Sequence, residues 1–146
     1  MMKKLFLGKT GGIPVIFIGL VFFLLVIAFL IFEMEGAYQN YYNAETILQR
    51  SCNSAVEKNI MDDYRADGIL RLDVAGAMDD FYRYIDTDMP DKYTVTVSTI
   101  TGSEMPPALT IAGTVTFSTL FGRYGFDDIT FDFAAQSTNY RTEQQP

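Results

Sequence analysis

The stretch GGIPVIFIGLVFFLLVIAFLIF, residues 11–32, decides how this chain is built. It is 22 residues long and contains no charged side chain. At a rise of about 1.5 Å per residue, a helix of this length crosses the ~30 Å hydrocarbon layer of a bilayer. Lipid offers the backbone no hydrogen-bond partners, so a spanning segment must be helical despite its β-branched and aromatic content. We therefore expect one transmembrane helix over residues 13–32, anchored by Ile13, Pro14, Phe17, Phe22 and Phe32.

Charges are divided unevenly around this stretch. Lys3, Lys4 and Lys9 give the first twelve residues a charge of +3, and no acidic residue precedes Glu33. The remainder carries 8 basic and 18 acidic residues, a net charge of −10. The positive-inside rule then predicts a cytoplasmic N-terminus, a single membrane crossing and an extracytoplasmic C-terminal domain. So acidic a surface disfavours nucleic acid as a partner, since such binding needs Lys and Arg against phosphate.

A cleaved secretory signal is the alternative interpretation of the apolar stretch. The apolar region of such a signal is typically about 7–15 residues long and is followed by two small residues at the cleavage site. Here Glu35 occupies the first of those two positions for the candidate Ala37. The length and the flank both favour a retained anchor.

The remaining composition limits the chemistry of the chain. With 146 residues it can form one small domain plus an extra element, and it has no His and one Cys. Catalytic triads with a His base, His-based metal sites and an internal disulfide framework are excluded. We expect no enzymatic activity and no cofactor. A hydrolase using the paired Asp128 and Asp132 is the weakest hypothesis, since a solvated strand face explains both residues.

Two helices are predicted after the membrane segment. Residues 33–61 contain no Pro and have small or apolar residues every three or four positions, namely Ala37, Tyr41, Ala44, Leu48, Cys52 and Ala55. The membrane helix should therefore continue into water. A break is expected at residues 62–68, followed by a helix with Asp73 as N-cap, ending near Asp86. Its apolar stripe starts at Leu70, and Asp79, Asp80 and Arg83 lie on the opposite face.

Beyond Pro90 the apolar period falls to two, which is typical of strands. Three alternating runs begin near residues 93, 109 and 129, and the connections at 101–107 and 122–125 are short. They predict a three-stranded antiparallel meander whose apolar face the helices cover. The fold class is thus α+β, with a basic leader over residues 1–12, the anchor over 13–32, a head over 33–136 and a loose tail over 137–146.

Two candidate sites remain. Cys52 lies on the helical stripe and is expected to be buried, while an intermolecular disulfide is the sharper alternative in an oxidising compartment. Asp86, Asp88 and Asp91 are a weak candidate for calcium, because the central Gly and the final Glu of an EF-hand loop are missing.

A basic leader ending in Gly12, an apolar helix that continues into an exported helix, and a small α+β head resemble the type IV pilin superfamily. Within it, the chain is most similar to the membrane-anchored pseudopilins of Tad-type (TadE-like) systems. The resemblance covers the whole chain as architecture and rests on no specific motif. It implies cleavage by a prepilin peptidase between Gly12 and Ile13. Phe17 then stands where the family usually has the Glu that sets subunit register, which argues against a major, polymer-forming pilin.

The expected function is that of a non-enzymatic, single-pass pilin-like or pseudopilin subunit of a surface filament or secretion apparatus. Its partners would be the lipid bilayer and other pilin-like subunits or assembly-machine proteins, with homo-oligomers forming through the helical stem. The alternative is an anchored monomeric accessory protein of a secretion or conjugation complex that never polymerises.

Overall fold

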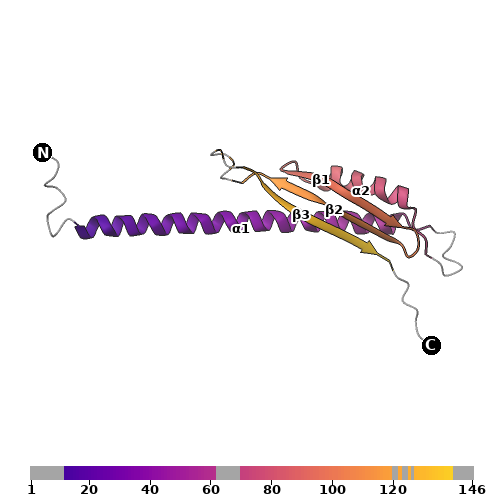
Figure 1. The fold of residues 1–146 in the computed structure, drawn as a ribbon, viewed down its shortest axis with the longest axis horizontal. Helices are drawn as coiled ribbons and strands as arrows, with labels where there is room; N and C mark the ends of the chain where they lie inside the picture. Colours follow the sequence, from indigo (N-terminus) through magenta and orange to yellow (C-terminus); the bar gives the residue numbers. More distant parts are fainter. Residues whose placement is uncertain (1–11, 62–69, 120–121, 123–124, 126, 140–146) are drawn as a thin grey trace, which may run out of the picture. The chain divides into compact units, whose positions relative to one another are not determined.

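The computed structural model describes residues 12–61, 70–119, 122, 125 and 127–139. Within these residues it has two helices and three strands: α1 (Gly12–Lys58), α2 (Val74–Asp88), β1 (Tyr93–Ser103), β2 (Ala108–Phe117) and β3 (Ile129–Thr138) (Figure 1). The chain divides into two compact units, residues 1–37 and 38–146, and α1 contributes to both. The expected α+β class and the predicted order of elements are confirmed.

The three strands form the predicted antiparallel meander, with β2 between β1 and β3. Val115 pairs with Val95 on one side and Phe131 on the other, which places apolar residues next to one another across the sheet. The connection between β2 and β3 contains Gly125, whose φ of +90° favours glycine. Each strand therefore has the apolar and the polar face that its sequence predicts.

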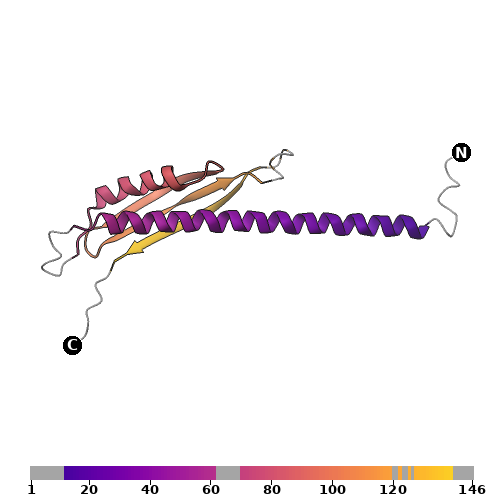
Figure 2. The ribbon, with the colours of Figure 1, turned by 180° about the vertical axis from the view of Figure 1, so that it is seen from behind.

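The core of the second unit lies between one face of this sheet and the two helices. Figures 1 and 2, seen from opposite sides, place α2 and residues 38–58 of α1 on the same face of the sheet. The helices contribute Leu48 and Phe81, and both are completely buried. The full cluster comprises Leu48, Cys52, Ala55, Val56, Leu72, Ala77, Phe81, Leu109, Ile111, Phe133 and Ala135. The apolar stripe predicted for the second half of α1 is thus a core face.

A β-bulge makes β1 longer than its alternation predicts. The pairing register with β2 shifts between Val97 and Thr99, leaving Ser98 as the extra residue. The shift returns Ile100 to the apolar face, where it packs against the core. The segment from Thr101, expected to be a connection, therefore remains in β1 as far as Ser103.

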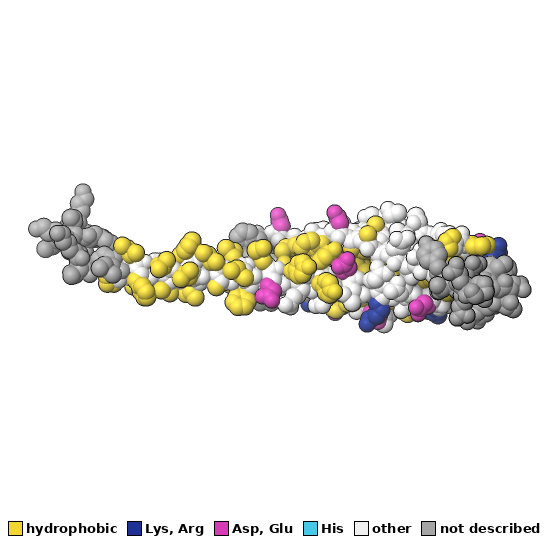
Figure 3. Space-filling view, turned by 90° about the horizontal axis from the view of Figure 1, so that it is seen from below, with side chains coloured by type: hydrophobic (Ala, Val, Ile, Leu, Met, Phe, Trp, Pro, Cys, Tyr) yellow, Lys and Arg dark blue, Asp and Glu magenta, His cyan; other side chains and the backbone are white. Residues whose placement is uncertain are grey.

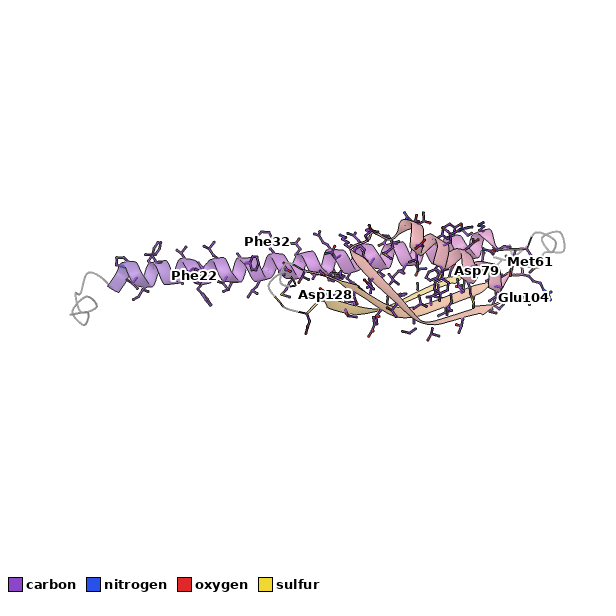
Figure 4. The ribbon with its side chains drawn as sticks, turned by 90° about the horizontal axis from the view of Figure 1, so that it is seen from above. Phe22, Phe32, Met61, Asp79, Glu104 and Asp128 are labelled. Atoms are coloured by element: carbon purple, nitrogen blue, oxygen red, sulfur yellow. The ribbon has the colours of Figure 1, made fainter. Side chains whose placement is uncertain are left out.

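The end of α1 also differs from the prediction of a helix reaching Met61. The helix ends at Lys58, and Ile60 then forms an antiparallel bridge with Leu72. The Met61 N–H donates to the Arg71 carbonyl at 2.9 Å, so pairing with the chain before α2 replaces another helical turn. The Leu72 N–H donates to the Glu104 carbonyl at 3.1 Å, and Met61 and Glu104 lie at the same end of the head (Figure 4).

Two other boundaries needed correction. The helix α2 begins at Val74, after the predicted N-cap Asp73, so Leu70 lies before the helix and the helix extends to Asp88. The tail expected from residue 137 begins later, since Ser137 and Thr138 pair with Leu109 and Ala108 of β2. The predicted leader up to residue 11, the predicted break at 62–68 and the end of the tail from residue 140 lie outside the described residues.

Gly113 on β2 provides a test of the sheet packing. A Cβ on this residue would collide with the Thr96 carbonyl oxygen and would lie 3.0 Å from the Phe133 ring. We expect Gly113→Ala to lower the free energy of unfolding by about 1–3 kcal/mol, as overpacking does. Denaturant unfolding of the full chain in detergent measures this change. Gly36→Ala is the control, because no atom lies within 4 Å of its added methyl. A Gly113→Ala chain as stable as the parent would contradict the packing described.

Candidate functional site

The first unit presents an apolar helical surface. All 16 large hydrophobic side chains between residues 15 and 32 are exposed, including those of Phe17 (64%), Phe22 (67%) and Phe32 (73%). Hydrophobic side chains cover the visible face of this segment in Figure 3, and the labelled Phe22 and Phe32 project from the helix in Figure 4. Pro14 lies in the first turn of α1, where it interrupts no hydrogen bond between helical turns.

By length and composition, this N-terminal helix could cross a membrane. Leaving one Val, Leu, Ile or Phe side chain in water instead of burying it costs roughly 1.5–3 kcal/mol. For 16 such side chains the total transfer free energy from water to an apolar environment is of the order of tens of kcal/mol. Nothing in the described part of the chain covers this segment, and an apolar environment such as lipid would suit it.

Gly12 and Ile13, the residues on either side of the predicted cleavage site, begin α1. Their backbone is helical, while the side chain of Ile13 and the leader up to residue 11 lie outside the described part. Cleavage between them stays a prediction.

Cys52 is buried in the core of the head, as its place on the stripe predicts. Its side chain has no exposed surface, and Sγ donates toward the Leu109 carbonyl at 3.6 Å. Burial raises the pKa of the Cys52 thiol to about 11, which disfavours the reactive thiolate. The intermolecular disulfide stays a prediction, and it would require the head to open.

The three carboxylates considered for calcium are not assembled into a site. No group of three acidic or other ligating side chains that could hold a metal occurs among the described residues. Asp88 instead pairs with Arg50 of α1 at 3.0 Å. Asp86 and Asp91 are exposed at and beyond the end of α2.

Asp80 is the residue whose role the sequence did not reveal. It was expected on the solvent face of the second helix, but it is 8% exposed. Asn59 Nδ2 donates to it at 2.9 Å, Lys58 Nζ lies 3.0 Å away, and Arg83 pairs with it from the next turn of α2. The hydrogen bonds from Asn59 and Lys58, assisted by the Arg83 charge, lower the pKa of Asp80 despite its partial burial. This cluster connects α2 to the end of α1, and no periodic pattern indicates it.

A second feature missed from the sequence is a groove on the outward face of α1. Its lining consists of Tyr42, Glu45, Thr46, Gln49, Arg50 and Asn53. All six residues belong to the second unit. The spacing of three or four residues between the uncharged side chains of this groove could have indicated it in the sequence. The stripe of small residues on the other face of the helix is more apolar and dominates the periodic pattern.

Comparisons with known proteins identify no relative. No protein-family model, curated protein or solved structure matches the chain. The features available for a function are thus the apolar helical segment, the acidic head with its closed core, and the exposed face of α1.

The buried thiol gives a prediction about reactivity. A rise in thiol pKa from 9.0 to about 11 reduces the thiolate at pH 8 about 100-fold. Cys52 in the folded chain should therefore react with iodoacetamide at least that much more slowly than in urea. Cys52→Ala combined with Asn53→Cys supplies an exposed thiol one residue away and should react at an ordinary rate. Equal rates for the two thiols in the folded chain would contradict the burial of Cys52.

The Asp80 cluster predicts an acid-sensitive contribution to stability. Because the pKa of Asp80 is lowered by folding, its ionised form stabilises the fold above about pH 4, the ordinary carboxyl pKa, and this contribution is lost as the pH falls through the folded-state pKa. Asp80→Asn should lower the thermal midpoint at pH 7, and the difference from the parent should shrink below about pH 4.

Asp79→Asn is the matched control, because it removes a neighbouring carboxylate and leaves the contacts with Lys58, Asn59 and Arg83 intact. Thermal unfolding followed by circular dichroism between pH 3 and 7 compares the three chains. A difference between Asp80→Asn and the parent that stays constant over this range would exclude the ionised carboxylate as its cause.

Proposed function

We propose that this chain is a non-enzymatic, single-pass subunit of a membrane-associated assembly, resembling a pilin or pseudopilin in its architecture. Residues 13–32 anchor it in the bilayer. The α+β head outside makes contacts with other proteins of the assembly, at the cell surface or in a secretion apparatus.

One observation carries the proposal. The 16 exposed hydrophobic side chains form an uninterrupted apolar segment, whereas Leu48, Phe81 and the other core residues of the head are buried. The head needs no further apolar partner to cover its core. The helix segment does need one, and lipid or the apolar helices of neighbouring subunits are the surroundings that suit it.

The orientation follows from charge. The basic leader favours the cytoplasmic side, and the domain that carries −10 is placed outside. Because Phe17 replaces the Glu usual in pilins, the proposal is a minor or non-filament subunit in preference to a major pilin. A monomeric accessory protein of the same machinery is the alternative.

Membrane insertion and orientation can be tested with single cysteines on either side of the anchor. The chain is expressed in bacteria with Cys52→Ala, and spheroplasts are prepared from the cells. Asp86→Cys, on the exposed face of α2, should then react with a membrane-impermeant maleimide. In a host without prepilin peptidase, where the leader is retained, Lys4→Cys should react only after detergent is added. A second substitution, Leu24→Arg, should reduce insertion, since Arg at the centre of a spanning helix costs about 2.5–3.5 kcal/mol. Labelling of Lys4→Cys in intact spheroplasts would contradict the orientation, and a chain recovered in the soluble fraction would contradict the anchor.

N-terminal processing and association with other subunits distinguish the pilin-like subunit from the monomeric accessory protein. A pilin-like subunit should be recovered from native membranes with Ile13 as its first residue and should associate with other subunits. An intact Met1 on a chain that remains monomeric in the membrane would favour the accessory protein.

A further inference from the structure

The groove on the outward face of α1 has the residue spacing of a helix–helix contact. Tyr42, Thr46, Gln49 and Asn53 are separated by four, three and four residues, which is the alternation of the two core positions in a coiled-coil heptad. In the same register Glu45 takes position g of one heptad and Arg50 position e of the next, the two flanking positions that form ion pairs between helices. The six residues that line the groove are thus the set that faces a partner helix in a coiled coil.

Four of the six groove residues are exposed and two, Glu45 and Gln49, are half-buried, and the face differs in composition from the rest of the acidic head. Tyr42 is 61% exposed, and the four residues at the core positions carry no charge. The opposite side of the same helix carries the buried residues Ala44, Leu48 and Ala55. The groove reaches the sheet at Gln49, which donates to the Gln136 carbonyl of β3 at 2.8 Å. Tyr is enriched and acidic residues are depleted at protein interfaces, and this face has both properties at its centre.

We propose that residues 42–53 of α1 bind the same residues of a second copy of this chain, in a parallel pair in which Glu45 of each copy pairs with Arg50 of the other. The inference rests on the proposed function as a membrane-anchored subunit and names the partner and register of that subunit. In a parallel coiled coil the flanking residue of one helix meets the residue five positions later on its partner, and Glu45 and Arg50 are five positions apart. A two-fold symmetric pair contains this contact twice.

Both flanking side chains are able to make this contact. Glu45 has no ion pair within the described residues, and it lies beside the groove. Arg50 pairs with Asp88 of its own chain at 3.0 Å, but the two side chains are 63% and 36% exposed. An exposed pair of this kind contributes little to stability, and the guanidinium group has donors left for a second carboxylate.

Membrane anchoring can compensate for the low affinity of a helix–helix contact made by polar residues. Thr, Gln and Asn at core positions specify register at a cost in affinity, so the contact should be weak between free heads in water. Copies inserted with the same orientation are parallel, and confinement to one bilayer raises their effective concentration. The two Glu45–Arg50 contacts also offset some of the repulsion between two heads of like charge.

A charge-swap series tests the register. Full chains labelled with a donor or an acceptor dye are mixed in phosphatidylcholine vesicles, and energy transfer is measured against the protein-to-lipid ratio. Glu45→Arg and Arg50→Glu should each weaken association about threefold or more, because both contacts become repulsive. The double substitution should restore association, since opposite charges again face each other. Asp88→Asn is the matched control, which removes the partner of Arg50 within the chain and should leave association unchanged.

Disulfide cross-linking gives a second measurement. In a Cys52→Ala chain, Thr46→Cys should form a disulfide-linked dimer in vesicles under mild oxidation, and Asp86→Cys on α2 should not. Thermal unfolding of each variant checks that the head is folded. If the chains associate but neither the charge series nor the Thr46→Cys cross-link responds, the proposed contact is wrong and the subunit function stands. If the parent chain remains monomeric at every protein-to-lipid ratio, the proposed contact is overturned, and the subunit function is then decided separately by whether the chain recovered from native membranes associates with other proteins.

Discussion

The second half of α1 must serve as the inner wall of the head, and the remaining packing depends on this. Ala44, Leu48, Cys52 and Ala55 of α1 are completely buried, and the last three belong to one cluster with Leu109 of β2 and Ala135 of β3. The second helix packs on the same face of the sheet, and its position is fixed relative to α1 by the Asp80 contacts with Lys58 and Asn59. The head therefore has no complete core without the helix that precedes it in the chain.

Because one side of α1 is buried in the head, this chain has two kinds of apolar surface. Apolar residues in the second unit form a closed core at helical and strand spacing, whereas those between residues 15 and 32 are exposed on every side of the helix. An apolar surface on one side of a helix indicates packing within a domain, and an apolar surface all round indicates lipid or the centre of a bundle. The proposed anchor and the proposed contact face are thus different kinds of surface on one helix, the first apolar and the second polar with two flanking charges.

Much of this fold could be predicted because period and composition are local properties. The alternation of Val95 and Val97 or of Phe131 and Phe133, and the capping of α2 by Asp73, follow from spacing and residue type. Features that depend on a partner distant in sequence could not be predicted. The bulge at Ser98 hid the continuation of β1, and the polar residues Ser137 and Thr138 are ordered as a strand because β2 pairs with them. Asp80 looked like a solvated residue because two of its partners, Lys58 and Asn59, come from the end of α1. The outer groove of α1 was overlooked for a different reason, since its seam is polar.

The direction of α1 relative to the strands determines how the head would respond to mechanical load. Tyr41 lies against Phe131 near the start of β3, and Gln49 donates to the carbonyl of Gln136 near its end, so this part of α1 and β3 run in the same direction. A pull along α1 would slide the helix lengthwise over the sheet and strain all these contacts together, whereas a pull across the sheet would break them one after another. A head loaded lengthwise in this way would resist tension better than its modest core suggests, a property that would suit the anchored subunit proposed above.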